Sequence, residues 1–164
     1  SGSGRGTANH LAQVWFDERL RAKSTYNGFK GTAAAVAALV DERVDASWVY
    51  TTTGVKYSDK LRMLAVAMDK RHAKFPNVPT FRELGYDFVG GAYRGIAVPN
   101  TTPEDIQMKI SKIFAKIDQD PAYLAEKAAL GFVPLSVGYK EIPAFMTSRR
   151  VEYLPLAREA GLID

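Results

Sequence analysis

The stretch Gly4-Arg5-Gly6-Thr7-Ala8-Asn9-His10 runs directly into the apolar-rich residues 11–16. Its glycines permit a tight turn and a close approach of the backbone to a ligand. Thr7 is suited to begin a helix, because its hydroxyl can accept a hydrogen bond from a free N–H of the first turn. Apolar residues follow at near-helical spacing, so the pattern predicts an amphipathic helix over about residues 7–21.

The start of that helix is a candidate anion site. The first amide groups of a helix have no partner within it and lie at the positive end of the helix dipole. A glycine-rich turn before such a helix therefore favours binding of a carboxylate or phosphate. The predicted site consists of Gly4, Gly6, Thr7, Ala8 and Asn9. The alternative is that the glycines only cap a helix, and Ser1-Gly2-Ser3 could originate from cloning.

A second glycine–hydroxyl turn, Lys30-Gly31-Thr32, precedes the alanine-rich residues 33–40. Alanine has the highest helix propensity, so a second helix is predicted there. We expect Lys30, Gly31, Thr32 and Ala33 to contribute a second set of groups to the same anion. Here too the alternative is a simple helix cap.

The chain alternates between predicted strands and helices. Such alternation is typical of an α/β fold with a mostly parallel sheet. Ligands of these sheets bind at the carboxyl ends of the strands, where the two turns and a third, at residues 50–53, are expected to lie. We predict strands at residues 23–29, 44–50, 61–68, 92–98 and 132–135, a short helix from residue 80, and longer helices from residues 102, 121 and 139.

Composition narrows the class of protein. The 164 residues are 46% hydrophobic and carry a net charge of +4, which is typical of a packed globular chain. The absence of cysteine excludes disulfides, thiolate zinc sites and cysteine nucleophiles. The basic residues are scattered, apart from a cluster at residues 70–74 that is better explained as a solvated loop than as a nucleic-acid footprint. No apolar run is long enough to span a membrane.

Catalysis and metal binding find little support in the residues. His10 and His72 are the only histidines and lie in different motifs. A triad of Thr7, His10 and Asp45 is conceivable, but we expect the ring of His10 either to pack or to donate to a backbone carbonyl. No histidine and carboxylate share the spacing of metal ligands. We therefore expect a non-enzymatic protein without a cofactor or metal.

The order of several motifs resembles the substrate-binding receptors of the tripartite tricarboxylate transporters, the Bug family. The segments that end at Thr80 and Pro99 are the most specific. In order, the motifs are Gly4-x-Gly6-Thr7-x-x-His10-Leu11-Ala12, Phe29-Lys30-Gly31-Thr32, Val44-Asp45-Ala46, Leu61-Arg62-x-Leu64-Ala65-Val66-Ala67, Arg71-His72-x-x-Phe75-Pro76-x-Val78-Pro79-Thr80-Phe81-x-Glu83-Leu84-Gly85 and Tyr93-Arg94-Gly95-Ile96-Ala97-Val98-Pro99.

The resemblance implies a two-lobed bacterial periplasmic receptor of the type II periplasmic-binding-protein fold. Such receptors close on a small organic carboxylate and deliver it to a membrane permease. The family's glycine–serine loop corresponds to Gly4, Gly6 and Thr7, with threonine in place of serine. The resemblance further implies that residues 1–91 form the second lobe. Residues 92–164 would then cross back as a strand and C-terminal helices of the first lobe, and the N-terminal half of the receptor would be absent.

If that half is absent, an apolar helix face has lost its partner. Ile106, Ile110, Ile113 and Phe114 are spaced to be buried on one face of a helix. An exposed face of this kind favours association, so we expect a homo-oligomer or a dimer that swaps its C-terminal segment. The alternative to a receptor is a non-catalytic α/β interaction module that docks on a partner and binds no small molecule. A nucleic-acid binder would be favoured only by the basic charge.

Overall fold

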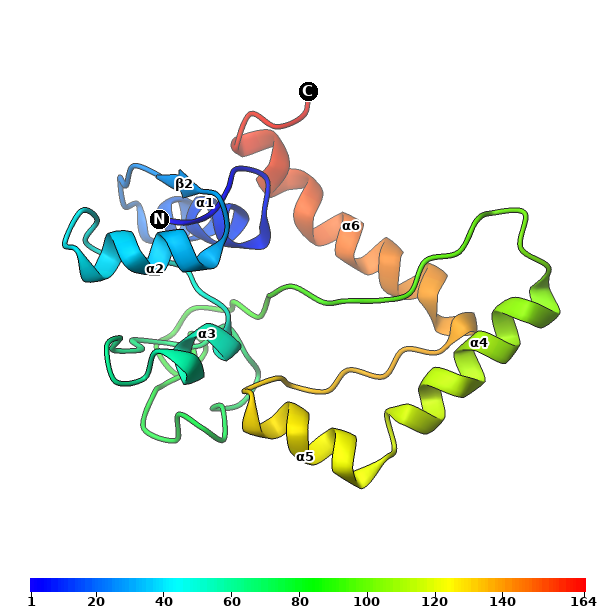
Figure 1. Cartoon of the computed structure of the whole chain (residues 1–164). Helices are drawn as coiled ribbons and strands as arrows, with labels where there is room; N and C mark the ends of the chain where they lie inside the picture. Colours follow the sequence, from blue (N-terminus) through cyan, green and yellow to red (C-terminus); the bar gives the residue numbers. More distant parts are fainter. The chain divides into compact units, whose positions relative to one another are not determined.

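The computed structural model describes all residues, 1–164, and divides into two compact units. We call Ser1–Ala92 together with Tyr153–Asp164 the sheet unit, and Tyr93–Glu152 the helical unit. Figure 1 shows the course of the chain through its helices and its short strands. No helix combines the length and the apolar character needed to cross a bilayer.

The sheet unit is built on a two-stranded parallel sheet. Strand β1 (Gly2–Ser3) pairs with β2 (Gly28–Phe29), with Gly2 opposite Gly28 and Ser3 opposite Phe29. Helix α1 (Ala8–Leu20) follows β1, and helix α2 (Thr32–Val40) follows β2. Both therefore begin at the carboxyl edge of the sheet, as expected for an α/β fold. A shorter helix, α3 (Thr51–Lys56), lies further along the chain.

Aromatic side chains form the core of the sheet unit. Trp15 of α1 stacks on Phe88, with ring centroids 4.0 Å apart, and meets the edge of Phe81 at 5.9 Å. Trp48 also stacks on Phe81, with ring centroids 5.9 Å apart. Leu156, from the C-terminal part of this unit, completes the buried cluster. Offset and edge-to-face pairs of this kind add to the stabilisation that burial of their area provides.

The predicted strands are mostly too long. Of residues 23–29 only Gly28–Phe29 is a strand, and residues 44–50 form no strand. The N–H of Trp48 nevertheless donates to the carbonyl of Ser1 (2.8 Å), and the amino group of Ser1 donates to the carbonyl of Ala46 (2.9 Å). This segment thus lies beside the start of β1, but its bonds reach only one residue there.

The predicted buried strand at residues 61–68 is wrong. Only Val66 pairs, in a single parallel bridge with Thr80, and Leu64 is 70% exposed. Val66 itself is buried, but its neighbours in the run have no strand to pair with, so no parallel sheet forms here. Residues 92–98 and 132–135 are not strands either.

Thr80 begins a chain reversal instead of the predicted short helix. Its N–H donates to Glu83 Oε2 (2.8 Å), and the N–H of Glu83 donates to Thr80 Oγ1 (3.1 Å), which are the two bonds of a capping box. Residues 81–85 then form consecutive turns, not a helix. Arg71 donates through Nε to both carboxylate oxygens of Glu83 (2.9 and 3.0 Å). This bond is the main cause that lowers the pKa of Glu83 below its usual value.

The helical unit contains α4 (Glu104–Ile117), α5 (Pro121–Ala129), the 3-10 turn η1 (Tyr139–Glu141) and the first part of α6 (Ile142–Glu159). Helix α4 is preceded by Pro103 at the N-cap, one residue later than the predicted Thr102. At α5, Asp120 Oδ1 accepts from the N–H of Tyr123 (3.0 Å), and Pro121 occupies the first helical position. The start of α5 is therefore a favourable one, whereas α4 has acidic residues in its first turn but no side-chain cap.

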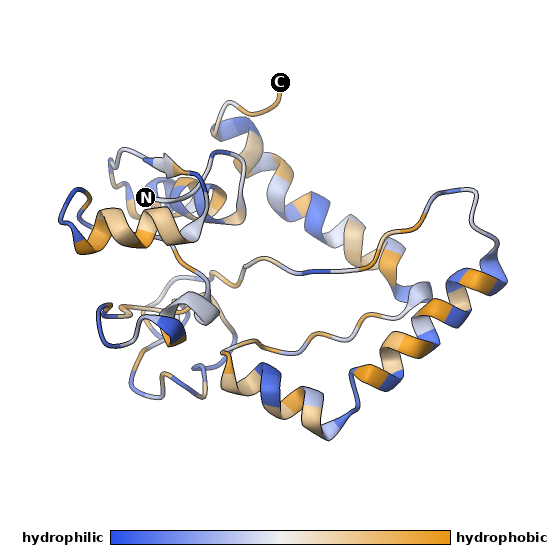
Figure 2. Ribbon diagram, viewed as in Figure 1, coloured by the Kyte–Doolittle hydropathy of each residue, from blue (hydrophilic) through white to orange (hydrophobic).

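No hydrophobic side chain of the helical unit is buried, whereas all the buried hydrophobic residues belong to the sheet unit. The residues of α4 that the spacing predicted to be buried are exposed or half-buried, and Ile113 is 57% exposed. Figure 2 shows hydrophobic and hydrophilic stretches alternating along this helix.

Candidate functional site

The first turn, residues 4–7, connects β1 to α1 in a conformation that glycine favours. Gly4 and Gly6 have φ of +68° and +74°, in a region that other residues rarely adopt. Two hydroxyls donate to the carbonyl of Gly4: Thr7 Oγ1 at 3.0 Å and Tyr26 Oη at 3.2 Å. Thr7 is at the N-cap position of α1 as predicted, but its hydroxyl closes the turn and does not cap the helix.

His10 holds the other side of this turn. Its Nδ1 accepts the N–H of Gly6 at 3.2 Å, its side chain is only 5% exposed, and its ring lies 4.4 Å from that of Tyr26. Burial, and then the positive charge of Arg5, lower the pKa of His10 below its usual value. The packing of the ring agrees with the prediction. Its hydrogen bond differs from the predicted one: the imidazole accepts from an amide and does not donate to a carbonyl. The N–H of Gly6 is therefore not available to a ligand.

The free donors at this helix start are main-chain N–H groups. Helical bonding in α1 begins with the N–H of Leu11, which donates to the carbonyl of Thr7 at 3.0 Å. The N–H groups of Ala8, Asn9 and His10 precede it and have no acceptor within the helix. The Asn9 side chain is 3% exposed, donates to the carbonyl of Trp48 and accepts from Ser3 Oγ at 3.3 Å. Asn9 thus has a structural side chain and a free backbone donor.

A cavity of about 80 Å³ opens beside Ala8 and Asn9. Trp48 and Tyr50 contribute to its wall. The remaining residues around it were not predicted: they are Leu11, Ala12, Val49, Ala67, Phe88, Gly90, Gly91, Tyr153 and Leu156. The pair Gly90-Gly91 was the available signal, since glycines leave space for a ligand to approach the backbone. Tyr153 Oη donates to the carbonyl of Gly91 at 2.9 Å and holds this segment.

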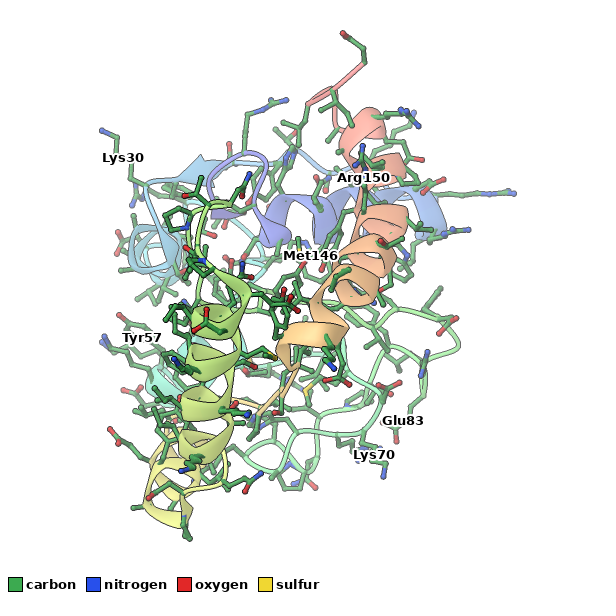
Figure 3. The ribbon with its side chains drawn as sticks, turned by 90° about the vertical axis from the view of Figure 1, so that its right-hand side faces the viewer. Lys30, Tyr57, Lys70, Glu83, Met146 and Arg150 are labelled. Carbon is green, nitrogen blue, oxygen red and sulfur yellow. The ribbon has the colours of Figure 1, made fainter.

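The second turn lies at the same edge of the sheet but outside the cavity wall. Because β1 and β2 are parallel and in register, the turns that follow them emerge side by side. Gly31 is the N-cap of α2, and helical bonding begins with the N–H of Ala35, so the N–H groups of Thr32 and Ala33 have no acceptor within the helix. None of these residues lines the cavity. Lys30 is exposed and extends away from the ribbon (Figure 3).

The third polar turn, residues 50–53, forms the start of a helix in the structure. Tyr50 is the N-cap of α3, and its carbonyl accepts from the N–H groups of Thr53 (2.9 Å) and Gly54 (3.0 Å). The hydroxyl run was expected to be a loop with any helix after it. Tyr50 nevertheless lines the cavity beside Ala8 and Asn9, whereas the predicted site residues Gly4, Gly6 and Thr7 do not line it. No cluster of three or more potential metal-ligating side chains is present.

Comparison with known proteins identifies similar receptors. The family model described as "Tripartite tricarboxylate transporter family receptor" matches residues 1–162. A UPF0065 protein from the TAR-I ttuE–ttuC′ intergenic region of Agrobacterium vitis is 30% identical over 82% of this chain and 40% of its own length. Protein BugT of Bordetella pertussis is 27% identical over 95% of this chain and 49% of its own. The chain thus spans no more than about half the length of these relatives.

Solved structures show the same fold. The periplasmic binding protein BugD matches with a TM-score of 0.82 and 28% identity, over 98% of this chain and 55% of that protein. Rpa4515 of R. palustris, a structure with adipate, matches with a TM-score of 0.84 and 19% identity, over 95% of this chain and 53% of that one. These neighbours confirm the α/β, periplasmic-binding-protein-like fold class, although the sheet seen here is small.

Proposed function

This chain belongs to the tripartite tricarboxylate transporter receptor family, and on that premise we propose that it contributes the start of α1 to a site for a small organic carboxylate. The observation that carries the proposal is the cavity beside Ala8 and Asn9, whose N–H groups have no acceptor in the helix. Backbone donors at a helix N-terminus suit a carboxylate because several N–H groups and the helix dipole act on one negative charge.

The proposal assigns no reactive group to the site. Solute binding is what the family and its periplasmic neighbours support, and such binding needs donors and exclusion of water, not acid–base chemistry. In our proposal Ala8 and Asn9 bind through main-chain N–H groups, while Gly4, Gly6 and Thr7 shape the turn. The second turn would take part only if the ligand, or another part of the protein, reached from the cavity to it. Its residues are Lys30, Gly31, Thr32 and Ala33.

The remaining parts of the proposal concern the complete receptor. We propose that residues 1–91 form one of its two lobes and that residues 92–164 belong to the other, with Tyr153–Asp164 returning to pack with the first. We further propose that the ligand binds in the cleft between the lobes. The receptor would act in the periplasm and deliver the carboxylate to the membrane permease subunits. Support for these statements comes from the family and from the structural likeness to BugD.

The N–H of Ala8 can be removed with little other change. Ala8 is the first residue of α1, where proline is tolerated, and Thr7 before it has the extended backbone (φ −84°, ψ 166°) that a following proline requires. If that N–H binds the carboxylate, Ala8→Pro should weaken binding about tenfold or more, as expected for loss of a hydrogen bond to a charged group. Isothermal titration with succinate, glutarate, adipate and benzoate would measure this effect.

Two controls distinguish the roles of the helix starts. Glu104→Pro makes the same kind of change at the first position of α4 and should leave affinity unaltered. Thr32→Pro tests the first position of α2 and would weaken binding only if the second turn contributes. Equal affinity of Ala8→Pro and the unmodified chain would contradict the proposed site.

The alternative is an interaction module that binds no small molecule, and the exposed apolar face of α4 favours it. The same ligand panel separates the two functions. If the chain bound none of the four acids at millimolar concentration and associated with itself as its concentration rose, the interaction module would be favoured.

A further inference from the structure

We propose that His10 is a positioning residue that holds the first turn, residues 4–7, and that protonation of its ring releases this turn. By holding the turn, His10 orients the free N–H groups of Ala8 and Asn9. The inference about the turn stands on contacts within the sheet unit. Its consequence for ligand affinity rests on the function proposed above.

Side chains hold this turn from both of its ends. The Gly6 N–H donates to His10 Nδ1 at 3.2 Å, while the carbonyl of Gly4 accepts from Thr7 and from Tyr26. His10 itself lies one helical turn after Gly6, so its position is set by α1. The turn that leads into α1 is therefore fastened to α1 by an imidazole nitrogen.

Tyr26 connects His10 to the same turn from a different segment. Its ring packs on the imidazole at 4.4 Å, and its hydroxyl donates to Gly4. Two aromatic side chains thus act together on one short loop whose glycines have little conformational preference of their own. Without them, both φ > 0 residues, Gly4 and Gly6, would have other conformations available.

The bond to Gly6 exists only for the neutral ring. Nδ1 can accept an N–H when it carries no proton, which requires the tautomer with its proton on Nε2. In the imidazolium both nitrogens are donors, so the N–H of Gly6 would face another N–H and the turn would have to move. Protonation is thus coupled to the geometry of the backbone immediately before Ala8.

The surroundings of His10 oppose its charge. Arg5, in the same turn, repels the imidazolium, and burial of the ring removes water that would solvate it. Tyr26 is neutral near pH 7, since burial raises the pKa of its phenol, and Tyr50 interacts electrostatically with Tyr26. The folded-state pKa of His10 therefore lies below about 6.5, the value of an exposed histidine. The bond from Gly6 to His10 therefore contributes its full stabilisation above about pH 6.5, and this stabilisation is lost as the pH falls through the lower pKa of the folded state.

Amide signals of the complete, ¹⁵N-labelled chain would test the inference without any ligand. Between pH 8 and 5 we expect the signals of Gly6, Ala8 and Asn9 to shift with one common midpoint, equal to that of the His10 ring and below about 6.5. The amide of Ile113, in the helical unit, gives a reference signal outside this turn and should stay constant.

His10→Asn provides the matched variant. The Asn oxygen can replace Nδ1 as an acceptor, and it does not titrate in this range. In this variant the Ala8 and Asn9 signals should no longer respond to pH. Signals of Ala8 and Asn9 that stay constant in the unmodified chain while the His10 ring titrates would overturn the inference.

Adipate is the probe for the effect on binding. The ratio of the affinities at pH 8 and pH 6 should be severalfold larger for the unmodified chain than for His10→Asn, and protonation of adipate itself cancels between the two proteins. Affinity that rises at pH 6 only in the unmodified chain would overturn the positioning role, since the charge of His10 would then act on the ligand directly. Failure of adipate to bind at either pH would count against the proposed function, and the amide signals would still decide the role of His10.

Discussion

The sheet unit and the helical unit differ in what holds their helices in place. In the sheet unit, Trp15 of α1 stacks on Phe88 within a buried aromatic cluster. In the helical unit, α4 begins with two acidic residues and α5 with an Asp cap, yet no hydrophobic side chain is buried. Local signals are thus sufficient to specify a helix, but only contacts with other elements give it a core.

The stripe on α4 shows what the helical unit lacks. Ile106, Ile110, Ile113 and Ile117 recur at intervals of four, three and four residues, which places them along one side of the helix. Such a stripe is usually covered in a stable fold. The difference between the units is therefore one of missing partners, not of poor helix formation. Three experiments would test or sharpen this comparison.

The largest effect is expected in the aromatic core. Trp15→Ala removes the side chain that stacks on Phe88 at 4.0 Å and meets Phe81 at 5.9 Å. We expect a loss of about 3–5 kcal/mol in the free energy of unfolding, because a large buried ring is replaced by a cavity. Urea unfolding followed by tryptophan fluorescence and circular dichroism would measure it. Ile113→Ala in the helical unit is the control, and an equal loss there would contradict the comparison.

A moderate effect is expected on association. If a second copy of this chain covers the exposed stripe of α4, Ile113→Lys should weaken self-association by about tenfold or more, since burial of one such side chain is worth about 1.5–3 kcal/mol. Sedimentation velocity over a range of concentrations would show the shift toward monomer. Lys112→Glu changes a charge beside the stripe and is the control. If the unmodified chain remained monomeric at high concentration, the expected oligomer would be refuted.

The smallest effect is expected at a local helix start. Asp120→Ala removes the carboxylate that accepts from the N–H of Tyr123, which should reduce stability by about 1 kcal/mol. Because the helical unit has no buried hydrophobic core, this change should appear mainly as lost helical signal in circular dichroism. Glu126→Ala, an exposed change within α5, should have little effect. Equal loss of helix in both variants would show that capping is not what specifies α5.

The helices were more predictable than the strands for a physical reason. Helices α1, α2, α4 and α5 begin within about two residues of their predicted starts, because their signals lie within each segment. A strand needs a neighbour to pair with, and residues 61–68 have only Thr80 as a partner at Val66. An apolar run thus indicates that burial is possible, but not that a sheet is present to provide it.

The candidate site was predictable as a position and not as a set of donors. The glycine-rich turn and the helix after it indicated Ala8 and Asn9, which line the cavity. The bond from Gly6 to His10 was missed, because an imidazole at that spacing can equally pack, donate or accept. Gly90 and Gly91 were missed because they reach the cavity only through the packing of a distant segment. Whether these residues bind a ligand stays a prediction.

The order of residues alone determined where helices can begin, which class of fold the chain adopts, and which family it resembles. These properties depend on neighbouring residues and on motifs that can be read along the chain. Only the tertiary structure decided that the Gly6 amide is occupied, that the Asn9 side chain is structural, and that α4 lies uncovered. Each of these outcomes depends on which distant group arrives within hydrogen-bonding or van der Waals distance, and spacing along the chain does not specify that.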